Sequence, residues 1–266
     1  MRSKKLKELL AVSINASIKG GYTIMDVYQS DFPFEIKEDN SPLTLADKKC
    51  NQVIENVLTH TNIPILSEEG SRITYEKRKK WTYFWLVDPL DGTKEFIKKN
   101  GEFTVNIALI YNGSPIMGVV YIPVKKELYF AMQGLGSYKV KINSVISNLD
   151  NLLLEADKLP IDYKRDNYVI VGSRSHMSVE TKDFFKQKKK EHRDVVILEV
   201  GSSLKLCMVA EGKADAYPRY SPTMEWDTAA GHAIVKYSGF SVKKYNSSDD
   251  IVYNKKNLIN PWFLVD

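Results

Sequence analysis

The stretch from Asp88 to Thr93 constrains this chain most, because it places two carboxylates in a tight turn directly after the apolar residues 84–87. Taken alone, Asp-Pro and Asp-Gly are ordinary turn signals: proline fixes φ, glycine accepts positive φ and aspartate bonds nearby backbone groups. A buried strand that ends in Asp88 and Asp91, however, concentrates negative charge, which costs free energy unless a cation neutralises it. Gly92 lets a ligand approach the backbone, and Thr93 can begin a helix whose first N–H groups face an anion. The stretch therefore predicts a metal ion and a phosphate at one turn.

Two further acidic clusters lie on either side of this turn. Glu68 and Glu69 follow a short apolar segment at residues 63–66, and Asp227 precedes an apolar helical segment at residues 228–235. Singly, the glutamates fit a solvated turn and Asp227 fits a helix N-cap. We interpret the clusters in this order along the chain as parts of one metal site.

These residues carry a resemblance to a known group of enzymes. Glu68-Glu69, the Asp88–Thr93 run and Trp226-Asp227 together resemble the lithium-sensitive, magnesium-dependent phosphatase superfamily, which includes inositol monophosphatases, fructose bisphosphatases and bisphosphate nucleotidases. The similarity spans most of the chain. Residues 85–96 most resemble the bacterial 3'(2'),5'-bisphosphate nucleotidases of sulfur assimilation. Inositol monophosphatases usually carry Thr-Asn-Phe where this chain has Lys-Glu-Phe at residues 94–96.

The resemblance implies a metal site with two or three magnesium ions. One ion would be held by Glu68, Asp88 and the main-chain carbonyl of Leu90, and a second by Asp88, Asp91 and Asp227. Oxygen ligands on separate loops suit magnesium, which prefers near-octahedral oxygen coordination. Two cations about 3.5–4 Å apart can activate a water and stabilise the leaving oxygen.

The resemblance also implies catalytic and substrate-binding residues. Asp47 and Thr93 would together accept the proton of the attacking water, although Asp47 would otherwise be read as a surface carboxylate on a helix. Two Gly-Ser segments, at residues 172–176 and 201–205, each follow a predicted strand and can either bind an anion or simply turn the chain. The substrate contacts implied by the resemblance are Gly92, Thr93, His176, Ser202, Lys205 and Arg219.

The leading functional hypothesis is magnesium-dependent hydrolysis of adenosine 3',5'-bisphosphate to AMP and phosphate, in support of sulfur assimilation. An inositol or sugar monophosphatase is the alternative among enzymes. A non-catalytic, metal-dependent binder of phosphorylated nucleotides or RNA is the alternative from another class, but binding alone does not require a water-activating pair. We expect a small phosphorylated nucleotide as substrate and no nucleic acid, because the basic runs at 77–80 and 186–190 lack interleaved aromatics and fit solvated faces.

Composition and cysteine usage set broader limits. The chain has 266 residues, of which 43% are hydrophobic, so it can bury a sizeable core. Cys50 and Cys207 are too few for a disulfide scaffold and fit reduced core thiols. The basic start resembles a signal peptide, but Ser13 and Asn15 interrupt the apolar run, and an amphipathic first helix is predicted. We expect a cytoplasmic protein without a transmembrane segment, able to sit peripherally at the inner membrane and to form a homodimer.

The predicted elements give an α/β protein with an α+β first half and an α/β second half. The first half, residues 1–148, would carry most metal ligands, and the second, residues 149–266, the nucleotide contacts and the last ligand. Asn112-Gly113 predicts a hairpin, and consecutive hairpins indicate an antiparallel sheet. The resemblance implies a layered sugar-phosphatase fold of alternating helix and sheet layers. The predicted helices are 6–28, 44–60, 179–190, 204–211 and 226–238, the predicted strands 63–66, 83–87, 104–111, 116–122, 128–132, 168–171, 195–199 and 214–217, and the predicted linker 31–40.

Overall fold

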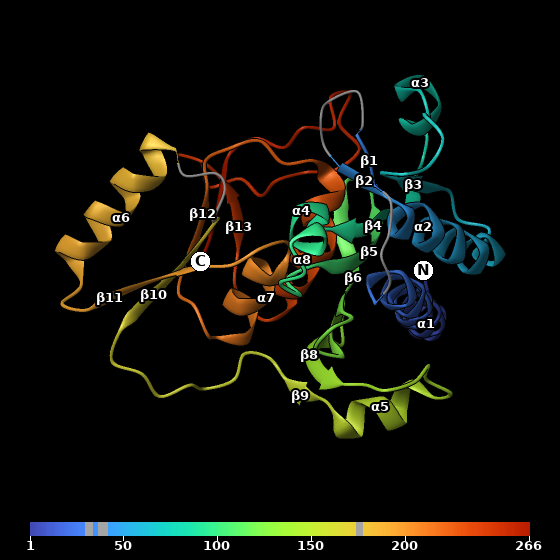
Figure 1. Ribbon diagram of the computed structural model, residues 1–266, viewed down its shortest axis with the longest axis horizontal. Coiled ribbons are helices and arrows are strands. Elements are labelled where there is room, and N and C mark those ends of the chain that lie inside the picture. Colours follow the sequence, from blue (N-terminus) through green and yellow to red (C-terminus); the bar gives the residue numbers. More distant parts are fainter. Residues whose placement is uncertain (30–33, 37–41, 174–177) are drawn as a thin grey trace.

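The computed structural model describes residues 1–29, 34–36, 42–173 and 178–266 of the chain. Its helices and sheets alternate in layers: α1 and α2 on one side, then the large sheet, then α7 and α8, then the smaller sheets, and α6 outermost (Figure 1). The predicted layered α/β architecture is therefore confirmed. Within the described residues, no helix is both long enough and apolar enough to cross a membrane.

The first layer consists of α1 (Ser3–Tyr28) and α2 (Leu45–Leu58), which pack against each other. Gly20 lets the two helices approach closely, because a Cβ there would lie 2.7 Å from Sγ of Cys50 on α2. The linker predicted between these helices is wrong in part. Residues Phe34–Ile36 (β1) pair antiparallel with Pro42–Thr44 (β2), so the chain forms a short ladder before α2 begins.

The central sheet has the strand order β3-β4-β5-β6-β7-β8-β9. The hairpin predicted at Asn112-Gly113 joins β5 to β6, and both residues have the positive φ of a type I′ turn, 47° and 76°. The expectation of a wholly antiparallel sheet fails at one edge, because β3 runs parallel to β4 after a crossover through α3 (Tyr75–Arg78). The strands are β3 (Ile65–Ser67), β4 (Tyr83–Asp91), β5 (Thr104–Tyr111), β6 (Ser114–Ile122), β7 (Glu127–Met132), β8 (Gly136–Lys141) and β9 (Asp157–Lys158).

The two faces of this sheet build two separate cores. Side chains alternate along β4, so Trp85 and Val87 join the core under α1 and α2, whereas Phe84 and Leu86 join the core under α7 (Leu204–Glu211) and α8 (Glu225–Tyr237). Asp88 continues the Phe84–Leu86 series. The sheet therefore directs this carboxylate toward α8 rather than toward α1.

The second half adds small sheets beyond α7 and α8. β10 (Tyr168–Gly172) and β11 (Val195–Glu199) pair in parallel, as expected for two strands joined by the helix α6 (Val179–Glu191). The strand predicted at 214–217 differs in its bounds: β12 is Tyr217–Arg219, and Ala216 just before it forms an isolated parallel bridge with Ile170. The remaining elements are η1 (Thr59–Thr61), α4 (Thr93–Ile97), α5 (Leu149–Glu155), β12 (Tyr217–Arg219), β13 (Val242–Lys244) and β14 (Phe263–Val265).

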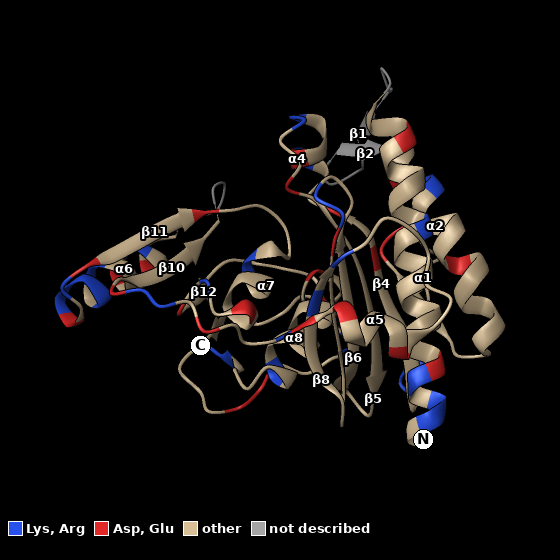
Figure 2. Cartoon of the chain, turned by 90° about the horizontal axis from the view of Figure 1, so that it is seen from below, with Lys and Arg blue, Asp and Glu red and all other residues tan. Residues whose placement is uncertain are grey.

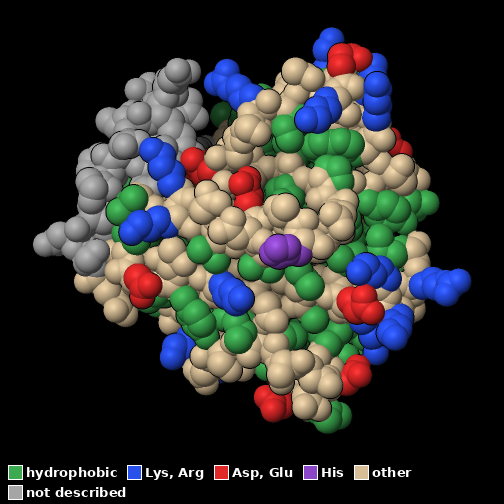
Figure 3. All heavy atoms as spheres, turned by 90° about the vertical axis from the view of Figure 1, so that its right-hand side faces the viewer, with side chains coloured by type: hydrophobic (Ala, Val, Ile, Leu, Met, Phe, Trp, Pro, Cys, Tyr) green, Lys and Arg blue, Asp and Glu red, His purple; other side chains and the backbone are tan. Residues whose placement is uncertain are grey.

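The basic runs behave differently from each other. Lysines gather on α6 (Figure 2), and those of residues 186–190 are mostly exposed, as predicted. The run at 77–80 is not simply solvated, because the guanidinium of Arg78 is buried and donates hydrogen bonds to Asn254 Oδ1 and to the carbonyl of Lys256, both at 2.9 Å. On the face shown in Figure 3, basic and acidic side chains are interspersed with hydrophobic ones.

Candidate active site

A β-bulge at the end of β4 sets the direction of the carboxylates of Asp88 and Asp91. Asp88 pairs with Asn106 on β5, and Asp91 pairs with Thr104, so the register shifts between them. In a regular strand, residues three apart point to opposite faces. The bulge places both carboxylates opposite residues that share one face, and Pro89 fits there because a bulge needs no ladder N–H.

Carboxylates from three elements meet beside this bulge. Glu68 follows β3, Asp88 lies on β4 and Asp227 is the third residue of α8; one carboxylate oxygen from each lies within 4.8 Å of the others. Asp227 is not the N-cap residue, a position that Met224 takes, but its Oδ2 accepts the Met224 N–H at 2.9 Å. The capping contact and the cluster therefore use the same side chain.

The electrostatics of this cluster fit a divalent cation. Burial, together with the charges of Glu68, Asp91, Asp227 and Asp47, raises the pKa of Asp88 well above its usual range. Burial and the neighbouring carboxylates likewise raise the pKa of Asp227. Crowded acids in a buried site are unfavourable without a counter-charge, and carboxylate oxygens are the ligands that magnesium takes. The residues present thus suit the metal that the family resemblance implied.

The predicted proton acceptor pair lies next to the cluster. Asp47, on α2, is buried with 2% exposure, which overturns the reading of it as a surface carboxylate. The Thr93 hydroxyl lies 3.4 Å from Asp47 Oδ2 and 3.4 Å from the carbonyl oxygen of Leu90. The Leu90 N–H donates to Asp88 Oδ1 at 3.1 Å. Helix α2 and the β4–α4 turn thus hold the residues together.

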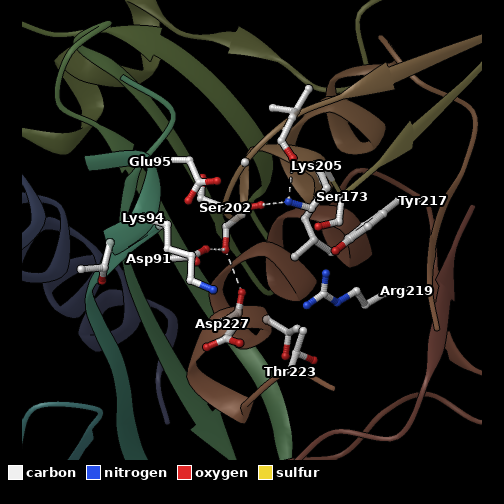
Figure 4. A pocket seen from close by; sticks show the side chains of 17 residues that line it. Asp91, Lys94, Glu95, Ser173, Ser202, Lys205, Tyr217, Arg219, Thr223 and Asp227 are labelled. Atoms are coloured by element: carbon white, nitrogen blue, oxygen red, sulfur yellow. Dashed lines mark hydrogen bonds between the residues drawn. The ribbon is translucent and has the colours of Figure 1, made fainter. Parts of the chain in front are cut away.

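A cavity of about 300 Å³ opens beside Asp91 and Asp227. The N-terminal turn of α4 lines it with Gly92, whose φ of 98° favours glycine, and with Thr93. Figure 4 shows Lys94 and Arg219 facing this cavity from different sides. Within the described part of the chain, the Lys94 amine has no hydrogen-bond or ion-pair partner. The cavity therefore joins an acidic end to basic side chains.

The predicted nucleotide contacts fall into three groups. Ser202 and Arg219 line the cavity, and Arg219 donates one hydrogen bond to the Pro222 carbonyl at 3.0 Å. Lys205 also lines it, but its buried amine donates to the carbonyls of Val200 and Ser202 at 3.0 and 2.6 Å. Burial lowers the pKa of Lys205 to about 8. His176 lies outside the described residues.

Two polar residues of the site were not among the predicted contacts, although Ser203 lies within the Gly-Ser segment at residues 201–205. Asn106 is buried in the apolar strand β5, where its amide donates to Asp91 Oδ2 at 3.4 Å and to Ser203 Oγ at 2.9 Å. Ser203 Oγ lies 2.8 Å from Asp91 Oδ2 and 2.7 Å from the Asp227 carbonyl. For Asn106 the available signal was an amide at an inward position of a buried strand, because such an amide needs a polar partner.

Comparisons with known proteins agree with this geometry. The model of the inositol monophosphatase family matches residues 5–262. The chain is 43% identical over 249 residues to the 3'(2'),5'-bisphosphate nucleotidase CysQ of Escherichia coli (strain K12), covering 92% of this chain and 94% of that protein. It is 32% identical over 268 residues to the 3'(2'),5'-bisphosphate nucleotidase CysQ of Haemophilus influenzae, covering 97% and 93% of the two chains.

Solved structures give the same picture. The crystal structure of CysQ from Bacteroides thetaiotaomicron, a bacterial member of the inositol monophosphatase family, superposes with a TM-score of 0.93 at 46% identity and covers 99% of this chain and 98% of its own. An inositol monophosphatase from Anabaena superposes with a TM-score of 0.69 at 24% identity, over 98% and 91% of the two chains, a likeness of fold alone.

Proposed function

The chain belongs to the inositol monophosphatase family, and on that premise we propose that it is a magnesium-dependent 3'(2'),5'-bisphosphate nucleotidase. The proposed reaction converts adenosine 3',5'-bisphosphate and water to AMP and phosphate, a step that fits sulfur assimilation. The observation that carries the proposal is the junction of the carboxylate cluster with a cavity lined by Lys94 and Arg219. One phosphate can meet the acidic end with its cations while the other meets basic side chains.

The carboxylate cluster would hold the metal. Glu68, Asp88 and the Leu90 carbonyl would take one magnesium ion, and Asp88, Asp91 and Asp227 a second, with Asp88 shared. Magnesium bound there would neutralise the acids, orient the phosphate and lower the pKa of a water at the site. The raised pKa values of Asp88 and Asp227 support this assignment, because burial and the neighbouring carboxylates disfavour their charged forms unless a cation is present.

Residues of the chain would accept the proton of the attacking water. Thr93 Oγ1 would accept this proton while passing its own to Asp47 Oδ2. The 3.4 Å separation of the two side-chain oxygens is long for such a transfer, but catalytic hydrogen bonds often tighten only when substrate is bound. Burial of Asp47 keeps its carboxylate in a fixed position beneath the turn. The pair would therefore act as one unit.

The cavity would bind the rest of the nucleotide. The N–H groups of Gly92 and Thr93 would contact the reacting phosphate from the start of α4. Arg219 and Ser202 would contact the nucleotide, and Lys94 adds a positive charge without a partner in the described chain. Because the Lys205 amine already bonds two carbonyls of the loop, we expect Lys205 to act mainly by holding that loop in place.

A product analysis tests the proposed reaction. The purified chain is incubated with adenosine 3',5'-bisphosphate and magnesium, and the nucleotide product is separated by chromatography. We expect AMP and phosphate in equal amounts, and no turnover after chelation of the metal. Turnover that persists in excess chelator would contradict the metal chemistry, and adenosine 3'-monophosphate as product would contradict the orientation of the substrate.

A cytoplasmic setting, association with the inner membrane, a homodimer and the division near residue 148 remain predictions.

A further inference from the structure

Ser203 occupies the N-cap position of α7, yet its side chain does not cap the helix. A serine at this position usually accepts a hydrogen bond from the N–H of the second or third helical residue. Here the N–H of the third helical residue, Leu206, and that of the fourth, Cys207, reach the main-chain carbonyl of Ser203 instead, at 3.1 and 3.2 Å. Ser203 is buried, with 2% exposure, and its hydroxyl is directed away from its own helix. Its role must therefore be sought in what it contacts.

The Ser203 hydroxyl contacts groups from three other elements. It lies 2.9 Å from the Asn106 amide nitrogen, 2.8 Å from Asp91 Oδ2 and 2.7 Å from the Asp227 carbonyl oxygen. The Asn106 amide is fixed in turn by the Thr104 hydroxyl, which donates to Asn106 Oδ1 at 2.9 Å. Because Asn106 donates to Ser203 Oγ, the single hydroxyl proton is left for an acceptor on the far side. A carboxylate is the stronger acceptor, which favours Asp91.

The two carboxylate oxygens of Asp91 therefore lie in different environments. Oδ2 accepts hydrogen bonds from Ser203 and, at the longer distance of 3.4 Å, from Asn106. Oδ1 receives no hydrogen bond from any residue in the described ranges, so it is the oxygen available to a cation. Figure 4 shows Asp91 and Asp227 side by side at one end of the cavity, with the hydrogen bonds to both drawn as dashed lines. The hydroxyl thus fixes one ligand candidate and contacts the helix that carries another.

We propose that Ser203 is a positioning residue that orients Asp91 toward magnesium and joins the metal cluster to the loop that lines the cavity. The proposal rests on the proposed function, because it treats Asp91 and Asp227 as metal ligands. Groups that hold a metal ligand in place typically contribute 10- to 100-fold in metal affinity. The adjacent Gly201 and Ser202 line the cavity, so a shift of this loop changes the nucleotide end and the metal end together.

A magnesium titration without nucleotide tests the proposal. Calorimetry, or the rise in Tm with added magnesium, gives the dissociation constant for the wild type and for Ser203→Ala. We expect that constant to rise about 10- to 100-fold in Ser203→Ala. Ser17→Ala is the matched control, because it removes a buried hydroxyl that donates only to the Ile14 carbonyl of its own helix, at 2.8 Å. Its magnesium affinity is expected to equal that of the wild type.

Further variants separate positioning from folding. Asn106→Ala should also weaken magnesium binding. Because both residues orient one carboxylate, the loss of affinity in the double variant should not exceed the product of the two single losses. Ser203→Thr, which keeps the hydroxyl, should restore affinity. In turnover assays the half-saturating magnesium concentration should move while kcat at saturating magnesium stays near that of the wild type. Wild-type magnesium affinity in a folded Ser203→Ala overturns the proposal and leaves the nucleotidase standing. A wild type that binds no magnesium overturns both.

Discussion

Asp88 and Asp91 face the same side of the central sheet because the β4 bulge pairs them with Asn106 and Thr104, two residues apart on β5. Two carboxylates on one buried face repel each other, and burial adds to the cost of their charges. This arrangement is destabilising without a metal ion, and a bound cation would offset the repulsion. The metal-free and metal-bound chains should therefore respond in opposite ways to the loss of one charge.

Asp88→Asn tests this arrangement. The asparagine keeps an oxygen for the Leu90 N–H but removes the charge whose pKa is raised by burial and neighbouring acids. We expect turnover below about a tenth of wild type at saturating magnesium. Without metal, we expect the free energy of unfolding to rise by on the order of 1 kcal/mol. A phosphate-release assay gives the turnover, and urea unfolding without metal gives the free energy of unfolding. A variant that keeps its activity, or that loses stability without metal, contradicts the two-metal account.

Asp47→Asn and Thr93→Ala test the proton acceptor. Each should lower kcat by about 10²- to 10⁴-fold, the usual contribution of a positioned acid or base, with little change in substrate binding. Because the residues act as one unit, the double variant should lose little more than either single variant. Losses that multiply would show that Asp47 and Thr93 act independently.

Arg219→Ala tests how the second phosphate is bound. A charge-assisted contact contributes roughly 1.5–3 kcal/mol, or about one to two decades in kcat/KM. We expect that loss with adenosine 3',5'-bisphosphate and a much smaller one with any monophosphate. Lys186→Ala, which removes an exposed cation on α6, is the matched control. Lys205→Ala should instead lower turnover of both substrate classes, because its amine holds the loop. Equal losses from Arg219→Ala on both classes would exclude its selective role.

The pH dependence of stability tests a buried charge away from the site. Burial alone would raise the pKa of Glu211, but hydrogen bonds from Lys213, Tyr129 and Tyr163 lower it to about 2. A lowered carboxyl pKa stabilises the fold above the unfolded value of 4.5 and loses that contribution as pH falls toward 2. By linkage the contribution is on the order of 3 kcal/mol. Urea unfolding from pH 7 to pH 3 measures it.

Glu211→Gln should lose this stability at pH 7 and show a shallower decline toward acid. Glu155→Gln, at an exposed position, controls for the change of residue type. If Glu211→Gln and the wild type lose stability in parallel between pH 5 and pH 3, the lowered pKa is not the source of the acid sensitivity.

The sequence predicted which acidic residues lie together better than it predicted the strands around them. Glu68, Asp88 and Asp227 form the predicted cluster because each follows or opens an apolar element, and apolar patterning determines where an element lies in the core. The bulge was not predictable, since it depends on the register of β4 against β5. Asn106 was missed for a related reason: its partners, Asp91 and Ser203, come together only through the sheet and α7.

Other differences have the same origin. Strand β12 begins at Tyr217, where its pairing with β14 starts, and Ala216 before it bridges to Ile170. Local pattern does not show either of these long-range pairings. The basic run suggested that Arg78 is solvated. The distant residue Asn254 accepts a hydrogen bond from its guanidinium, which permits its burial. In each case a contact between residues far apart in sequence outweighed the local pattern.

The ratio of kcat/KM values over a substrate panel tests whether the chain is a bisphosphate nucleotidase or an inositol monophosphatase. Phosphate release is measured with adenosine 3',5'-bisphosphate, inositol monophosphate and fructose 1,6-bisphosphate at one saturating magnesium concentration. We expect the nucleoside bisphosphate to be preferred over inositol monophosphate by at least the one to two decades attributed to its second phosphate. A chain that turns over inositol monophosphate as well as, or better than, adenosine 3',5'-bisphosphate would contradict this expectation.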